Sequence, residues 1–180
     1  MPDKDSVKLQ SGTSVSLCDY ILKHQIEEIQ PRQVVDFGAG IGKNGKITRG
    51  ILAEQVRLTA VEGCERTAEI LSAQSLYDEV YYSLIQEWVF KDLNKYDLAI
   101  FGDVLEHLTP KKIHTIIGRC LNKFKHIIVI CPLHEIFQEE IYGNPLEVHQ
   151  TYVTDTFFDR YNIIEKHIVK GKQWTIMNYI

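Results

Sequence analysis

Short apolar runs alternate with helix-like patterns along most of this chain. The apolar runs that predict strands cover 33–37, 57–62, 79–83, 96–102 and 126–131. The segments with helical spacing of apolar residues cover 15–30, 43–54, 64–74 and 110–123. Because strands that alternate with helices form parallel sheets with right-handed crossovers, this order predicts a doubly wound α/β fold with helices on both faces of the sheet.

The C-terminal part of the chain changes character. It begins with a polar loop, after which the pattern predicts a short helix near 153–159 and two strands at 161–169 and 173–180. The Lys-Gly-Lys sequence between these two strands suits a tight hairpin turn. The complete prediction is therefore a mostly parallel seven-stranded sheet with a C-terminal antiparallel hairpin, in a single domain over residues 1–180.

The composition is that of a globular protein with one core. Of the 180 residues, 44% are hydrophobic and 24% are charged, and the length lies in the usual range for one domain. A formal net charge of −4 lacks the basic excess on which nonspecific nucleic-acid binding depends, so nucleic acid is not an expected partner. No stretch approaches the roughly 20 apolar residues that span a bilayer, so membrane insertion is not expected.

The cysteines and the N-terminus bear on the compartment. Cys18, Cys64, Cys120 and Cys131 show no paired spacing, so the sequence indicates neither a disulfide framework nor a zinc site. The first residues lack an apolar segment of signal-peptide length. A reducing cytoplasm is therefore the expected location.

The candidate chemistry begins at residues 34–42, which read Val-Val-Asp-Phe-Gly-Ala-Gly-Ile-Gly. An apolar strand here leads into glycine at every second position. Glycine permits positive φ angles and close approach of the backbone to a ligand, and a strand that turns into a helix beside a bulky ligand needs both. The carboxylate of Asp36 would add negative charge near that ligand, which disfavours a polyphosphate.

Two other glycine-loop motifs overlap the same stretch. The spacing Gly-x-Gly-x-x-Gly at 40–45 matches the dinucleotide fingerprint, but the strand would then have to end later than its apolar pattern indicates. A P-loop over 40–46 fails at its last position, because Ile47 stands where a Ser or Thr hydroxyl would bind magnesium.

The set of Asp36, Gly38, Gly40 and Gly42 resembles the first motif of class I S-adenosylmethionine-dependent methyltransferases, in which an acidic residue and alternate glycines follow an apolar strand. The resemblance implies a Rossmann-like fold and S-adenosylmethionine as the cofactor. It also implies cofactor contacts along the whole loop, including Ala39.

Glu62 ends the second predicted strand, about 20 residues after the glycine turn. A carboxylate at that place can accept hydrogen bonds from both ribose hydroxyls of a nucleoside. The alternative is a solvated carboxylate at a strand end. The resemblance further implies that Gly63 and Cys64 lie along the ribose and the adenine.

The next two strand ends complete the expected cofactor site. After the third strand, Leu84 and Ile85 can enclose an adenine ring, although many members of the family have an acidic residue here and this chain does not. After the fourth strand, residues 101–108 resemble the fourth motif of the family, with Asp103 beside the methionine part of the cofactor. An apolar run that ends in Asp also resembles a Walker B motif, so this segment does not separate the methyltransferase interpretation from the P-loop one.

Transfer of a sulfonium methyl group requires mainly that donor and acceptor are held close and in line. If the acceptor is a hydroxyl or a protonated amine, a base must take its proton, and histidine suits that role near neutral pH. His107 and His149 are the candidates, each with a structural hydrogen-bonding role as its alternative. A metal site is not expected, because Glu106 and His107 would point about 100° apart on a helix and no further ligands stand at supporting spacing.

The function expected from these features is that of a cytoplasmic methyltransferase that acts on a small-molecule or glycan-type acceptor. Residues 1–30 would form an N-terminal helical cover, and the loop at 132–152 would recognise the acceptor. One alternative is a methyltransferase-like domain that binds the cofactor or a protein partner without turnover. The other is a nucleotide-binding protein that uses residues 40–46 as a phosphate-binding loop.

Overall fold

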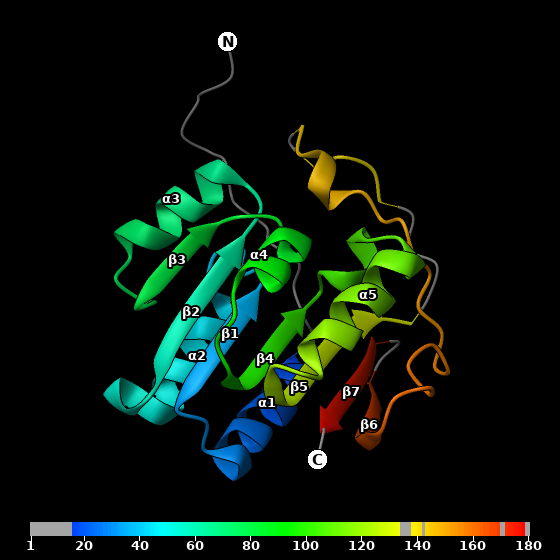
Figure 1. Cartoon of the computed structure of the whole chain (residues 1–180), viewed down its shortest axis with the longest axis horizontal. Coiled ribbons are helices and arrows are strands. Elements are labelled where there is room, and N and C mark those ends of the chain that lie inside the picture. The colour runs from blue at the N-terminus through cyan, green and yellow to red at the C-terminus, as the bar shows by residue number, and fades with distance from the viewer. Residues whose placement is uncertain (1–15, 134–137, 142, 170–171, 179–180) are drawn as a thin grey trace.

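The computed structural model describes residues 16–133, 138–141, 143–169 and 172–178. A sheet with the strand order β3-β2-β1-β4-β5-β7-β6 forms its centre (Figure 1). The strands are β1 (Gln33–Phe37), β2 (Arg57–Glu62), β3 (Glu79–Tyr82), β4 (Tyr96–Gly102), β5 (Phe124–Pro132), β6 (Ile163–Val169) and β7 (Lys172–Asn178). The strands from β1 to β5 pair in parallel, whereas β7 pairs antiparallel with both β5 and β6.

Helices cover both faces of the sheet. They are α1 (Ser16–Ile29), α2 (Lys43–Leu52), α3 (Glu65–Ala73), α4 (Ile85–Lys91) and α5 (Pro110–Cys120), with short 3₁₀ turns η1 (Ala53–Gln55), η2 (Leu105–His107) and η3 (Pro145–Glu147). One core cluster packs α4 and α5 against the sheet, in front of it in Figure 1, and a second packs α1, α2 and α3 against the other face. The predicted doubly wound, mostly parallel α/β sheet is thus confirmed.

The sequence of α5 shows why these helices dock as they do. Pro110 occupies the first helical position, where its missing N–H costs no helical hydrogen bond. Ile113, Ile116, Ile117 and Cys120 recur at helical spacing and are all buried. This single apolar stripe fixes the face of the helix that lies on the sheet.

Two local predictions differ from the structure. The short helix expected near 153–159 is wrong, because residues 155–160 form turns. The amides of Phe157, Asp159 and Tyr161 each donate to the carbonyl three residues earlier, and the fully buried ring of Phe158 anchors the segment. Conversely, no helix was predicted at α4, which buries Trp88 and Val89 in only seven residues.

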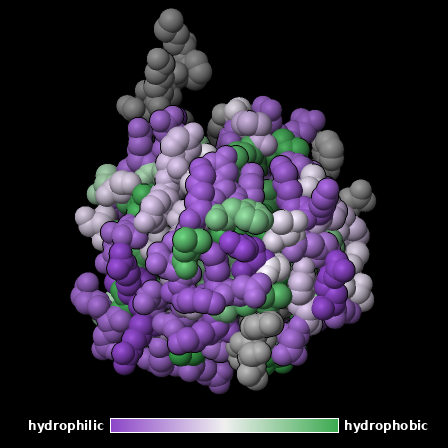
Figure 2. Space-filling view, in the orientation of Figure 1, coloured by the Kyte–Doolittle hydropathy of each residue, from purple (hydrophilic) through white to green (hydrophobic). Residues whose placement is uncertain are grey.

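Some of the predicted features lie outside the described residues. These are residues 1–15 of the expected N-terminal cover, residues 134–137 and 142 of the expected acceptor loop, and the hairpin turn at 170–171. Among the described residues, no helix has both the length and the apolar character needed to cross a membrane. The face seen in Figure 2 is mostly hydrophilic, with small hydrophobic areas. None of the four cysteines forms a disulfide.

Candidate functional site at the strand ends

A cavity lies where three parallel strands end at the same edge of the sheet. Because β1 lies between β2 and β4, the strand order reverses between β1 and β4, which is where open α/β sheets bind ligands. The cavity has a volume of about 280 Å³ and is lined by the loop after β1, the ends of β2 and β4, the start of α4 and parts of the segment 144–150. This volume is close to the lower limit of about 300 Å³ for small-molecule sites.

The loop after β1 has the backbone that its glycines predict. Gly38, Gly40 and Gly42 have φ angles of +65°, +53° and +82°, which residues with a Cβ atom rarely adopt. Space is also limiting at Gly38, where a Cβ atom would lie 2.4 Å from Cγ2 of Val104. Both the conformation and the available space therefore require glycine at position 38.

Glu62 is held at the end of β2 by the loop that it faces. Its Oε2 atom accepts a hydrogen bond from the amide of Gly40 at 2.9 Å, and its Oε1 atom accepts one from the amide of Cys64 at 2.8 Å. Burial raises the pKa of Glu62, and the two amide donors act in the opposite direction. Since a carboxylate oxygen has two lone pairs, both oxygens can accept a second hydrogen bond from a ligand in the cavity. This arrangement fits the two hydroxyls of a ribose.

Asp36 lies beneath the glycine loop and is not among the residues that line the cavity. It is fully buried, and it accepts hydrogen bonds from the hydroxyl of Tyr77 at 2.7 Å and from Nδ2 of Asn44 at 3.2 Å. Tyr77 in turn packs against Gly45, where a Cβ atom would lie 2.3 Å from the tyrosine oxygen. This position differs from the expectation of a charge beside the ligand. The carboxylate instead ties β1 to α2 and to the segment before β3.

The burial of Asp36 makes a prediction about pH. Its pKa is raised from 3.8 to about 6, mainly by burial. A carboxyl group with a higher pKa in the folded state binds more protons when folded, so its contribution to stability is complete below about pH 4 and is lost as the pH rises through about 6. The quantity to compare is the unfolding free energy of the wild type minus that of the variant Asp36→Asn. We expect this difference to fall by up to about 3 kcal/mol between about pH 4 and pH 7. Urea denaturation across this range measures the difference, and a difference independent of pH would contradict the prediction.

The remaining strand ends also contribute to the cavity. Leu84 and Ile85, at the start of α4, both line it. Leu146 reaches across from the segment 144–150 and lies so close to Gly63 that a Cβ atom there would be 2.8 Å from its Cδ1. Asp103 follows β4 with a φ angle of +51°, and its amide donates to the carbonyl of Ile130 at 2.8 Å. Non-glycine residues with positive φ store strain and cluster at functional sites.

Hydrogen bonds fix the segment before residue 152 against η2. The amides of Gln150 and Thr151 both donate to the carbonyl of Glu106, at 2.8 and 3.0 Å. The Thr151 hydroxyl also donates to the carbonyl of Leu108. One residue earlier, the amide of His149 donates to the carbonyl of Gln138 at 3.1 Å. The part of the cavity wall that residues 144–150 form is therefore tied to η2, which follows β4.

These bonds bring the two candidate histidines together. The ring centres of His107 and His149 lie 4.9 Å apart, at an angle of 66° between their planes. Burial, and to a smaller degree the nearby His149, lower the pKa of His107. Glu106 is only 2% exposed and completes a group of three potential metal ligands with the two histidines. The expectation that Glu106 and His107 have no supporting ligand is thus corrected, because the fold supplies His149 from a distant part of the sequence.

Comparison with known proteins bears on the fold. No protein-family model and no curated protein matches the sequence. Among solved structures, the plantazolicin methyltransferase BpumL in complex with SAH matches with a TM-score of 0.68 at 10% identity, over 91% of this chain and 84% of its own. The N-terminal domain of EvdMO1 in the presence of SAH and D-fucose matches with a TM-score of 0.64 at 9% identity, over 94% of this chain and 86% of its own. The fold is that of class I methyltransferases.

TehB from Haemophilus influenzae matches with the same TM-score as BpumL, 0.68, at 11% identity, over 89% of this chain and 62% of its own. At such identities the likeness concerns the methyltransferase fold alone. In this fold, the glycine loop and Glu62, which the sequence motifs single out, line the cavity at the ends of β1, β2 and β4.

Most of the predicted site residues meet around the cavity of this methyltransferase fold. Those that line it are Gly38, Ala39, Gly40, Glu62, Gly63, Leu84, Ile85, Asp103 and His107. Asp36, Gly42 and His149 are not among the lining residues. Asp36 is buried beside the loop, Gly42 is the residue at which the loop passes into α2, and the ring of His149 contacts that of His107.

Several residues that build the site carry no signal in the sequence. Asn44 and Tyr77 hold Asp36, and Leu146 covers Gly63, but none of them belongs to a recognisable motif. A tyrosine just before the third predicted strand carries no local signal for a bond to the first strand.

Proposed function

We propose that this chain is an S-adenosylmethionine-dependent methyltransferase that transfers a methyl group to a small-molecule or glycan-type acceptor by in-line displacement. The observation that carries the proposal is the buried carboxylate of Glu62, which faces the cavity and is oriented by the amides of Gly40 and Cys64. Structural neighbours that contain SAH support the same cofactor.

The residues around the cavity have distinct roles in this proposal. Glu62 would bind the ribose hydroxyls, and the apolar side chains of Leu84 and Ile85 would hold the adenine. The loop around Gly38 and the strained position Asp103 would hold the methionine part. The cofactor supplies a sulfonium methyl group, so the protein has mainly to position the acceptor and exclude water.

The acceptor would enter beside the segment 144–150. This part of the cavity is polar, with Lys112, Asn144 and Gln150 in its lining, which suits an acceptor that carries hydroxyl groups. A neighbouring structure determined in the presence of D-fucose supports a glycan-type acceptor. His107 and His149 stand at this end, where an acceptor proton has to leave. We expect the enzyme in the cytoplasm, in keeping with cysteines that form no disulfide.

One alternative is a domain that binds the cofactor, or a protein partner, without turnover. It is motivated by the third strand end, where Gln86 lines the cavity and residues 83–86, directly after the strand, include no acidic residue. The phosphate-loop alternative receives less support. Lys46 is not among the residues that line the cavity beside the glycines. It instead lines an exposed depression, together with Arg49 and Leu76.

Titration calorimetry with S-adenosylmethionine, SAH, NAD and ATP, on the wild type and on Lys46→Ala, tests the proposal. We expect both adenosyl sulfur compounds to bind with Kd values on the order of micromolar, about −8 kcal/mol, in both proteins, because Lys46 lies away from the cavity. ATP binding that is lost in Lys46→Ala would contradict the proposal and favour the phosphate-loop alternative. Cofactor binding without methyl transfer to any of a broad panel of hydroxylated acceptors would favour a domain without turnover.

A further inference from the structure

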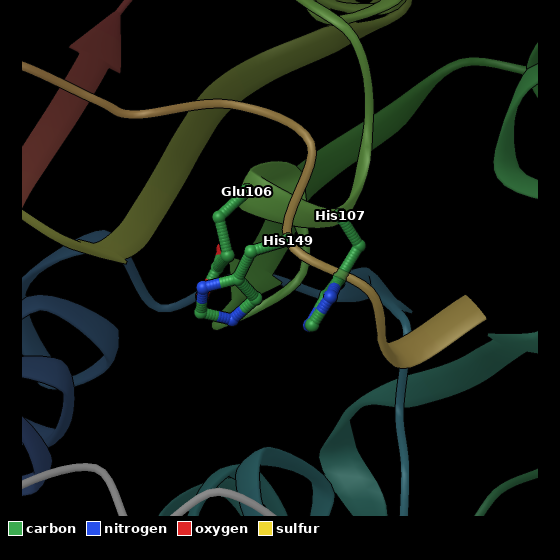
Figure 3. A group of neighbouring side chains, drawn as sticks. All are labelled: Glu106, His107 and His149. Atoms are coloured by element: carbon green, nitrogen blue, oxygen red, sulfur yellow. The ribbon is translucent and has the colours of Figure 1, made fainter. Parts of the chain in front are cut away.

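Three side chains that can bind a metal ion converge beside the cavity. Glu106, His107 and His149 each offer one potential ligand atom, and these atoms lie within 4.8 Å of one another. Glu106 and His107 belong to η2, whereas His149 comes from the segment that crosses over η2, and the three side chains extend into the same space (Figure 3). The site therefore joins two parts of the chain that are remote in sequence.

The surroundings of these side chains favour a bound cation. Glu106 is 2% exposed, so bulk water competes little for its carboxylate oxygens. The Nδ1 atom of His107 is also buried, and no described residue forms a hydrogen bond with it. Native structures rarely leave such an atom unsatisfied, and a bound ion is one of the usual reasons. A cation bound here would use one oxygen of the carboxylate and a nitrogen of each imidazole.

The types of ligand indicate the class of ion. Two imidazoles and one carboxylate form the set that holds zinc in several catalytic sites, with a further position left for water or substrate. Imidazole suits zinc, copper, iron and nickel, whereas magnesium and calcium prefer sites made of oxygen atoms only. The hydrogen bonds from Gln150 and Thr151 to the carbonyl of Glu106 fix the backbone on both sides of the site before an ion binds.

We propose that Glu106, His107 and His149 bind one divalent transition-metal ion, with Zn²⁺ as the ion that the ligands fit best. His107 also lines the cavity, so an ion on its imidazole lies beside the end at which the acceptor would enter. The part of the proposal that concerns catalysis rests on the proposed methyltransferase function. A metal ion with an open position would bind an acceptor oxygen and lower the pKa of its hydroxyl. The two histidines would then act as ligands, and not as bases that take the acceptor proton themselves.

The test uses the tag-free chain from which a chelator has removed all metal. This protein is titrated in a calorimeter with Zn²⁺ and, in a separate experiment, with Mg²⁺. No cofactor is present in either titration. We expect about one Zn²⁺ per chain and at least about tenfold weaker binding in His149→Ala and in Glu106→Gln, the range seen when the support of a metal site is lost. Absorption bands of the Co²⁺-substituted protein should change in the same variants. Circular dichroism shows whether each variant keeps its fold.

The matched control is His24→Ala. His24 stands 3.6 Å from Glu28 on the exposed surface of α1, so it also combines an imidazole with a carboxylate, but outside the cluster. Its replacement should leave Zn²⁺ affinity unchanged. The proposal is overturned if the wild type binds no Zn²⁺, if it prefers Mg²⁺, or if His149→Ala and Glu106→Gln bind Zn²⁺ as the wild type does. These outcomes are independent of S-adenosylmethionine binding, so the metal site and the methyltransferase function can fail separately.

Discussion

Replacing Glu62 with glutamine is expected to weaken SAH binding by roughly 10- to 100-fold, which corresponds to about 1–3 kcal/mol. Both carboxylate oxygens accept hydrogen bonds from loop amides, one from Gly40 and one from Cys64. A glutamine can offer an acceptor to only one of these amides, and its NH₂ group would face the other N–H group. The variant would therefore lose both the orientation of the loop and one acceptor for the ribose. Titration calorimetry with SAH measures the change.

Glu69→Gln provides the matched control for this prediction. Glu69 lies on the exposed face of α3, where the same change of chemistry affects no residue of the cavity. Its SAH affinity should equal that of the wild type. If Glu62→Gln, with its fold intact, bound SAH as tightly as Glu69→Gln does, Glu62 would have no part in cofactor binding.

The second large effect is expected at Gly38. In Gly38→Ala the new Cβ atom would lie 2.4 Å from a methyl carbon of Val104, at a φ angle of +65°. The left-handed conformation costs about 1–2 kcal/mol for a residue with a Cβ atom, and overpacking typically adds about 1–3 kcal/mol. We therefore expect the unfolding free energy to fall by roughly 2–5 kcal/mol, together with a loss of SAH binding. Urea denaturation and calorimetry measure the two effects.

Two other glycine-to-alanine variants separate the causes of this effect. Gly40 has a similar φ angle of +53° but open space around it, so Gly40→Ala should cost only the conformational part, about 1–2 kcal/mol. Gly118 lies within α5 with open space around it, so Gly118→Ala should stabilise the protein by up to about 1 kcal/mol. An equal loss of stability at positions 38 and 40 would show that contact with Val104 does not matter.

The parallel part of the fold could be predicted because each of its strands carries its own signal. Strands that are buried on both faces read as continuous apolar runs, and β1, β2 and β4 have the predicted bounds. The predicted helix near 153–159 was wrong because it relied on the apolar residues of this segment. Hydrogen bonds across turns and the burial of Phe158 decide its structure instead. Helix α4 was missed because it is too short for its periodicity to be recognised.

The candidate site shows the same division between local and remote information. The glycines and Glu62 can be recognised by their spacing in the sequence, because a turn beside a ligand restricts which residues can occupy these positions. The bond between Tyr77 and Asp36, and the approach of His149 to Glu106, depend on how distant segments pack. No spacing rule within one segment contains that information, which is why the sequence predicted a charged Asp36 beside the ligand and no metal cluster.

The most direct test of the central claim is a crystal structure of the protein with SAH. The account predicts SAH in the cavity at the ends of β1, β2 and β4, with the ribose hydroxyls within hydrogen-bonding distance of the Glu62 carboxylate and the adenine between Leu84 and Ile85. SAH bound elsewhere, or in this cavity with its ribose away from Glu62, would contradict the account.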